Sequence, residues 1–160
     1  MAVAIPSAVS DAITALLSSG TPGDALILSI DKNKNEFIIG SSLNGVTPEE
    51  IAEELPESVP RLIVARFNVP VDEQHVREYI VLLHFNPLSC STPLMRTYSA
   101  AKNDLLNGIK LLKERAREFE LNDERDFNPT WFGVKMRGLT GKAGNPLPGQ
   151  YSSGGFDGRI

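Results

Sequence analysis

The stretch TPLMRTYSAAKNDLL, residues 92–106, determines how the rest of the chain can be arranged. Thr92 followed by Pro93 is typical of a helix start, because threonine can cap the first turn and proline tolerates the first helical position. Gly108 weakens this helix without having to end it. The buried stripe continues at alternating steps of four and three residues through Leu94, Tyr98, Ala101, Leu105, Ile109 and Leu112. One long helix with one apolar face is therefore predicted.

The outward side of this helix carries few charges. A helix that only covers a core usually shows a denser charged face. Small and amide residues beside cations are typical of a protein-contact surface, and a merely solvated helix face is the alternative. Both interpretations stay open on these residues alone. The exposed row contains Arg96, Ala100, Asn103, Asn107 and Lys110, and Lys102 lies next to it.

Two apolar strands precede the long helix, and a short strand follows it. RLIVARFNV (61–69) and EYIVLLHF (78–85) each contain an unbroken apolar stretch instead of strict alternation, which is typical of strands covered on both faces. The polar segment PVDEQHVR (70–77) between them predicts a hairpin loop. REFEL (117–121) is the later strand. Because the long helix is a natural crossover, strands 78–85 and 117–121 are expected to be parallel.

The N-terminal part adds a helix and a hairpin. Ser7 or Ser10 can cap a helix that ends at Gly20. ALILSI (25–30) and EFIIG (36–40) then predict two strands, joined by the polar segment DKNKN. The buried stripe of the helix comprises Val9, Ile13, Leu16 and Leu17.

Two further helices have strong start signals. In VTPEEIAEELP, Thr47 and Glu50 predict a capping box with Pro48 at the first helical position, and Pro56 is expected to end the helix. NPTWFGVKM (128–136) predicts a last helix with Asn128 as its cap.

These elements define the fold class and the domain boundaries. The sequence predicts an α/β (α+β) fold with a central mixed five-stranded sheet sandwiched between helices. Residues 1–137 are expected to form a single domain. Residues 138–160 are rich in Gly, Pro and Ser and predict a flexible tail.

Composition limits the functional classes. The net charge of -4 argues against a nucleic-acid-binding protein, which usually shows a basic excess. One cysteine cannot form an internal disulfide, so a reducing compartment is expected. No apolar run reaches the length of a membrane span, and the start lacks a secretory signal. The expected location is the cytoplasm, and exclusion from the nucleus does not follow.

The two histidines and the cysteine give little support for catalysis. His84 alternates with apolar neighbours in its strand, which is typical of a core or edge histidine whose polar atoms are satisfied. His75 lies in a charged loop, where a solvated side chain is the simplest interpretation. Cys90 could act as a nucleophile with His84 as its base, and that hydrolase is an alternative to a structural cysteine.

Other polar segments are weaker candidates for a site. The glutamates in PEEIAEEL (48–55) interact favourably with the helix dipole, which explains them without a catalytic role. DERD (123–126) lacks the positional pattern of a calcium loop, and GLTGKAG (138–144) lacks phosphate-loop spacing. No His or Cys cluster has metal-ligand spacing. We therefore expect no catalytic residue, no metal and no cofactor.

The long helix resembles that of the actin-depolymerising-factor/cofilin homology fold. The resemblance lies in TYSAAKNDL (97–105), where a tyrosine is followed by small residues, a lysine, an amide residue and an acidic residue. SIDKNKNEFII (29–39), LNGVTPEEIAEELPESVPRLIVARF (43–67) and NPLSCSTPLMRTYSAAKNDLL (86–106) are similar to glia maturation factor, a branch of that superfamily. The resemblance covers residues 7–136.

This resemblance implies a non-enzymatic actin regulator. Cofilin-like members bind actin through the N-terminal segment and the long helix. Glia maturation factors direct that surface at the actin-related protein 2/3 complex, inhibit its actin nucleation and promote debranching of actin filaments. Cofilins carry lysines three and five positions before the helix tyrosine, and aligned on Tyr98 those positions hold Met95 and Pro93. Losing such contacts typically costs roughly 1–3 kcal/mol. The complex is thus favoured as partner, with a cofilin-like depolymerising or severing protein as the alternative.

The resemblance also implies where the partners bind. A second surface, around the loop between the third and fourth strands, is expected to face the first actin of the daughter filament. A monomer at cortical actin patches is expected, with actin bound weakly or on the filament side. The residues expected to contact the complex are Arg96, Ala100, Lys102, Asn103 and Asn107, and those of the loop are Asp72, Glu73, His75 and Arg77.

Overall fold

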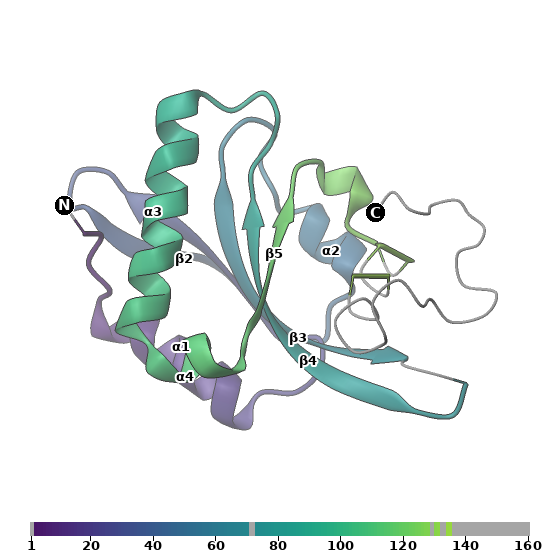
Figure 1. The fold of residues 1–160 in the computed structure, drawn as a ribbon. Helices are drawn as coiled ribbons and strands as arrows, with labels where there is room; N and C mark the ends of the chain where they lie inside the picture. The colour runs from purple at the N-terminus through teal and green to yellow at the C-terminus, as the bar shows by residue number, and fades with distance from the viewer. Residues whose placement is uncertain (1, 71–72, 129, 132–133, 136–160) are drawn as a thin grey trace.

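A five-stranded mixed sheet forms the centre of the molecule in the computed structural model (Figure 1). The structure describes residues 2–70, 73–128, 130–131 and 134–135. β4 and β5 are parallel, and the other neighbouring strands are antiparallel, which confirms the predicted mixed sheet. The strand order is β2-β1-β3-β4-β5, with bounds β1 Ala25–Asp31, β2 Glu36–Leu43, β3 Arg61–Pro70, β4 Val76–Phe85 and β5 Arg117–Leu121.

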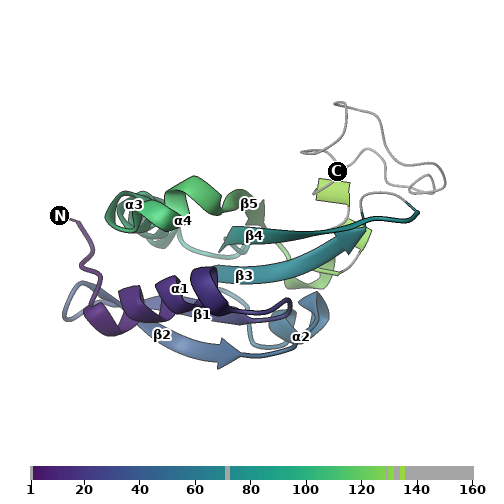
Figure 2. The ribbon, with the colours of Figure 1, turned by 90° about the horizontal axis from the view of Figure 1, so that it is seen from below.

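Helices cover both faces of this sheet, as predicted (Figures 1 and 2). The α1, α3 and α4 side packs on Leu62 and Val64 of β3, whereas the α2 side packs on Ile63 and Ala65. This alternation explains why residues 62–65 of β3 and 79–83 of β4 are unbroken apolar runs. The helices are α1 Ser7–Ser19, α2 Pro48–Ala52, α3 Thr92–Gly108, α4 Lys110–Arg115 and the short 3-10 helix η1 Glu124–Asp126.

The start of α1 differs from the prediction. Pro6 is the residue before the helix, and its carbonyl accepts hydrogen bonds from the N–H groups of Val9 and Ser10, both at 3.0 Å. Ser7 is the first helical residue and Ser10 lies inside the helix, so neither is the cap. The reason is that proline has a fixed φ and already supplies the extended residue that precedes a helix. The end at Gly20 is confirmed.

Thr92 is not the cap of α3 either. Ser91 is extended, and its hydroxyl accepts a hydrogen bond from the N–H of Leu94 at 3.4 Å. Thr92 is therefore the first helical residue, followed by Pro93. Because two adjacent hydroxyl side chains can each cap a helix, local sequence alone does not fix which one does.

Gly108 ends α3 instead of only weakening it. Ile109 is extended, and α4 begins at Lys110. Ile109 and Leu112 are nevertheless buried in the same core as predicted. A Cβ at Gly108 would collide with the side chain of Ile5, so glycine permits the N-terminal segment to pack here.

The second helix has the predicted start and an earlier end. The Thr47 N–H donates to Glu50 Oε1 at 2.9 Å and the Glu50 N–H donates to Thr47 Oγ1 at 3.2 Å, so the capping box is confirmed. The helix ends at Ala52, before Pro56. The Leu55 N–H bonds back to the Ala52 carbonyl, three residues earlier, which is the tightening common at helix ends.

β2 extends past Gly40, where the prediction ended. Ile27 pairs with Ser41 whereas Leu28 pairs with Ile39, so Gly40 is an extra residue in a β-bulge. At the C-terminal end, the Trp131 N–H donates to Asn128 Oδ1 at 3.0 Å, and residues 130–131 and 134–135 are helical. The other residues of the predicted last helix, and the predicted tail 138–160, lie outside the described residues.

Arg66 of β3 joins the sheet to the end of α1. Its Nε and Nη2 donate to the carboxylate of Glu78 on β4, each at 2.8 Å. Its Nη1 donates to the carbonyls of Leu16 and Leu17 at 2.8 and 3.1 Å. Arg115 adds a further bond to the Leu17 carbonyl at 2.6 Å. The last carbonyls of α1 are thus satisfied by two cations.

We expect Arg66→Met to lower the free energy of unfolding by about 2–4 kcal/mol, because it removes the guanidinium partner of the Glu78 carboxylate and one donor from each of two helix carbonyls. Urea unfolding would measure the loss. Arg77→Met, at an exposed position of β4, is the control and should cost less than about 0.5 kcal/mol. Equal losses in both variants would contradict this role of Arg66.

The same pair predicts a dependence of stability on pH. Hydrogen bonds from Arg66 hold the pKa of Glu78 below its ordinary value of 4.5. A lowered folded-state pKa gives stability that is present above the unfolded pKa and is lost as the pH falls through the folded value. We expect the difference in unfolding free energy between wild type and Glu78→Gln to be constant above about pH 5 and to shrink at lower pH. A difference that stays the same down to the acid transition would contradict this expectation.

Candidate partner-binding surface

The long helix α3 is fixed to the sheet by its tyrosine. Tyr98 is buried among the core residues of α1, α3 and the sheet. The N–H of Ile30, at the end of β1, donates to Tyr98 Oη at 3.1 Å. Because α3 lies between β4 and β5 in the chain, it crosses the sheet to make these strands parallel. The face of α3 opposite Tyr98 is therefore held in a defined orientation.

The outward row of α3 is exposed along its length. Arg96, Ala100, Asn103 and Asn107 are all exposed, at the spacing that places them on one side of a helix. Arg96 supplies the positive charge of this row, and the other three side chains are small or amide. A partner could therefore approach this row closely and form hydrogen bonds with it. The row itself would exert little electrostatic attraction.

Lys102 has different surroundings from the outward row. Its Nζ lies 3.3 Å from Glu118 Oε1 of β5, and its side chain is only 25% exposed. The charge of Lys102 also contributes to lowering the pKa of Glu120 and of His84, although the largest causes there are a hydrogen bond from Asn86 and burial, respectively. Lys102 therefore faces the junction of α3 with β5.

The N-terminal segment lies against α3 on the other side (Figure 1). The Val3 N–H donates to Asp104 Oδ2 at 2.9 Å. Ala4 pairs with the edge of β2: its N–H donates to the Asn35 carbonyl, and its carbonyl accepts from the Phe37 N–H, both at 3.0 Å. The N-terminal segment and α3 thus form one continuous surface.

The predicted loop surface lies elsewhere on the molecule. β3 and β4 continue as a hairpin that points away from α3 (Figures 1 and 2). Glu73, His75 and Arg77 are exposed at this end, and Asp72 lies outside the described residues. Val76 is 62% exposed beside them. The two sets of predicted residues do not combine into one site.

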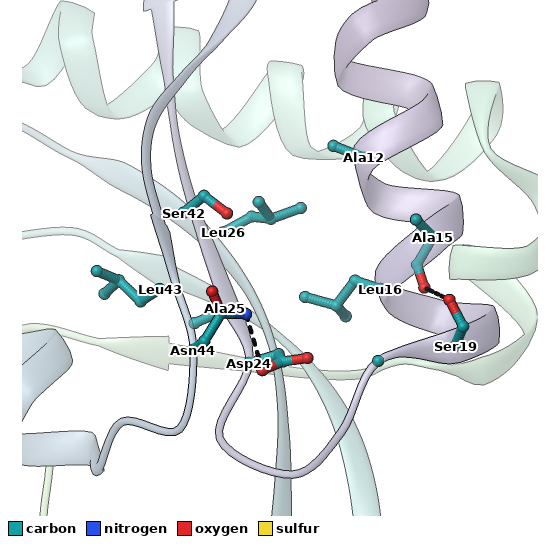
Figure 3. Close-up of a pocket in the computed structure, with 11 residues that line it drawn as sticks. Ala12, Ala15, Leu16, Ser19, Asp24, Ala25, Leu26, Ser42, Leu43 and Asn44 are labelled. Atoms are coloured by element: carbon teal, nitrogen blue, oxygen red, sulfur yellow. Dashed lines mark hydrogen bonds between the residues drawn. The ribbon is translucent and has the colours of Figure 1, made fainter.

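A groove of about 330 Å³ lies between α1 and the ends of β1 and β2 (Figure 3). Ala12 and Leu16 of α1 face Leu26 and Ser42 across it. Asp24, an ionisable residue at one end, accepts hydrogen bonds from the Thr21 N–H at 2.8 Å and from Asn44 Nδ2 at 3.1 Å, and the bond from Thr21 is the main cause of its lowered pKa. This carboxylate is already used in a turn, so the groove offers no obvious acid or base.

The cysteine hydrolase is not supported by the geometry. Burial raises the pKa of the Cys90 thiol and lowers the pKa of His84, the opposite of what a thiolate–imidazolium pair needs. The Cys90 Sγ donates to the Ser91 carbonyl at 3.3 Å. His84 is buried as predicted, but its Nε2 has no hydrogen-bond partner within the described residues, so the expectation of a fully satisfied histidine was wrong.

No group of three or more His, Cys, Asp or Glu side chains that could hold a metal occurs among the residues that the structure describes. None of the helices in the described part of the chain is long and apolar enough to cross a membrane.

Three residues on or beside α3 were missed by the sequence analysis. Glu118 of β5 pairs with Lys102, and Asp104 of α3 accepts a hydrogen bond from Val3, so both roles depend on strand and terminus positions that local patterns do not give. Leu88 is 84% exposed in the turn before α3. An apolar residue in the polar turn NPLSCSTP was the available signal for Leu88.

A family model and a relative identify the family of this chain, and solved structures show the same fold. A family model described as Cofilin/tropomyosin-type actin-binding protein matches residues 2–137. Glia maturation factor beta from Rattus norvegicus is 31% identical over 116 residues, which is 72% of this chain and 79% of that protein. The solution structure of glia maturation factor from Caenorhabditis elegans aligns with a TM-score of 0.69 at 23% identity, over 84% of this chain and 96% of that chain. Human coactosin-like protein aligns with a TM-score of 0.70 at 13% identity, over 92% and 97% of the two chains.

We expect Tyr98→Phe to lower the free energy of unfolding by about 1 kcal/mol, because the Ile30 N–H loses its acceptor while the ring still fills the core. Thermal unfolding by circular dichroism would measure it. Thr97→Val, on the exposed side of α3, is the control, although it also removes the bond from Thr97 Oγ1 to the Pro93 carbonyl. If Tyr98→Phe were no less stable than wild type, the anchoring role of the hydroxyl would be refuted.

Proposed function

Because the chain belongs to the glia maturation factor branch of the actin-depolymerising factor/cofilin homology family, we propose that it binds the actin-related protein 2/3 complex. Through this binding it inhibits actin nucleation by the complex and promotes debranching of actin filaments. It acts without covalent chemistry, as a monomer at cortical actin patches in the cytoplasm.

The observation that carries this proposal is the low charge of the exposed row on α3. Pro93 and Met95 occupy the positions where cofilins carry lysines, and Lys102 is engaged with Glu118. Arg96 is therefore the main cation that the row offers to a partner. Such a surface gives little attraction to the acidic surface of an actin monomer. It favours a partner that is held by close packing and hydrogen bonds.

The mechanism we propose is a shift in the populations of the complex. A protein that binds the detached or inactive state more tightly than the branch-forming state moves the equilibrium toward detachment. The exposed end of the β3–β4 hairpin, with Glu73, His75 and Arg77, is the proposed second contact, with the first actin of the daughter filament. Because this end points away from α3 (Figure 1), one molecule can contact two neighbouring subunits at once.

Imaging of preformed filament branches tests the proposal. Wild-type protein should increase the rate at which branches dissociate. Arg96→Glu combined with Ala100→Gln should weaken binding to the complex at least about tenfold, because it reverses the charge of the row and adds bulk at a close approach. Both positions are exposed, so the melting temperature should stay nearly unchanged.

Lys113→Glu on α4, also exposed, is the matched charge reversal and should debranch like wild type. Unchanged debranching by the α3 variant would place the contact elsewhere. If the wild-type protein instead binds actin monomers tightly and severs filaments without the complex, the cofilin-like alternative replaces this proposal.

A further inference from the structure

Lys102 is one of the residues predicted to contact the partner, and its charge is already engaged within the chain. Its Nζ lies 3.3 Å from Glu118 Oε1, and the Glu118 side chain is 45% exposed. The pair links the middle of α3 to the second residue of β5. The ammonium group is thus held toward the edge of the sheet, beside the outward row of α3.

The register of β5 adds a second carboxylate near this pair. Glu118 pairs with Leu82 of β4, and Glu120 pairs with His84. Leu82 belongs to the core beneath α3, so Glu118 and Glu120 lie on the sheet face that α3 covers. The titratable groups that act on Lys102 or feel its charge are therefore Glu118, Glu120 and His84. Two acidic side chains next to one ammonium reduce the attraction that Lys102 exerts on an approaching acid.

We propose that Glu118 is a specificity-determining residue, which weakens binding to acidic partner surfaces by keeping Lys102 in an internal ion pair. This inference rests on the proposed function, since it explains how a shared fold comes to favour the complex over actin monomers. A partner that uses Lys102 through its own carboxylate must first separate Lys102 from Glu118. A partner that packs on Ala100, Asn103 and Asn107 leaves the pair intact.

The size of the effect follows from the exposure of the pair. Partly exposed ion pairs contribute modestly, so freeing Lys102 should tighten binding to an acidic surface by about two- to fivefold. The gain should shrink as salt is added, because screening weakens the attraction between exposed charges.

The test compares Glu118→Gln with Glu114→Gln. Each variant removes one negative charge and one ion pair, but Glu114 pairs with Lys110 of α4, at 3.9 Å. Binding to purified actin monomers and to the purified actin-related protein 2/3 complex is measured by fluorescence at low and moderate salt. Glu118→Gln should bind actin monomers about two- to fivefold more tightly than wild type, and Glu114→Gln should not. Adding Lys102→Gln to Glu118→Gln should abolish the gain.

Three outcomes would overturn the inference: no gain for Glu118→Gln, an equal gain for Glu114→Gln, or a gain that persists without Lys102. The melting temperature of each variant shows whether it is folded, and the Lys102→Gln background separates a charge effect from a structural one. Failure here is distinct from failure of the proposed function. The latter is decided by whether wild-type protein binds the complex and removes branches, whatever Glu118→Gln does to actin binding.

Discussion

Arg66 lies on the central strand β3, where its guanidinium donates to Glu78 on β4 and to the last carbonyls of α1. Burying a guanidinium without these partners would cost free energy of folding. Strand β4 and the end of α1 must therefore both lie within hydrogen-bond distance of Arg66. Arg115, at the end of α4, reaches the same carbonyl of Leu17. The hydrogen bonds of Arg66 and Arg115 hold α1 and α4 next to each other on the sheet, and both helices share a core with α3. The position of the proposed binding surface therefore depends on these hydrogen bonds.

The outward row of α3 has a fixed position because the helix is bonded to the rest of the chain at several points. Tyr98 bonds to β1, Asp104 bonds to the N-terminal segment, and Lys102 pairs with β5. A surface held in this way loses little conformational entropy when a partner binds. Because the same contacts orient the polar side chains on both flanks, they also decide which charges a partner meets. Support of the helix and the proposed selection of its partner thus depend on the same contacts.

Most of the sheet could be predicted from the sequence, because apolar runs, turn residues and the crossover helix each have a local pattern. The capping box of Thr47 and Glu50 was predictable for the same reason. Local patterns did not decide between neighbouring hydroxyls at the start of α3, nor show that the chain turns at Ile109. For the candidate site, the exposed row was predictable from spacing. The pairing of Lys102 with Glu118 was not, because it depends on the register of a strand that follows an intervening helix.

The two outer strands of the sheet are protected in different ways. Ala4 covers the beginning of β2, and the bulge at Gly40 interrupts that strand further along. β5 is only five residues long and carries Arg117, Glu118 and Glu120. Short, charged or interrupted outer strands oppose the addition of a strand from another molecule. These features oppose the joining of copies of the chain into larger sheets, and the glutamate that pairs with Lys102 is one of the charges on the outer strand.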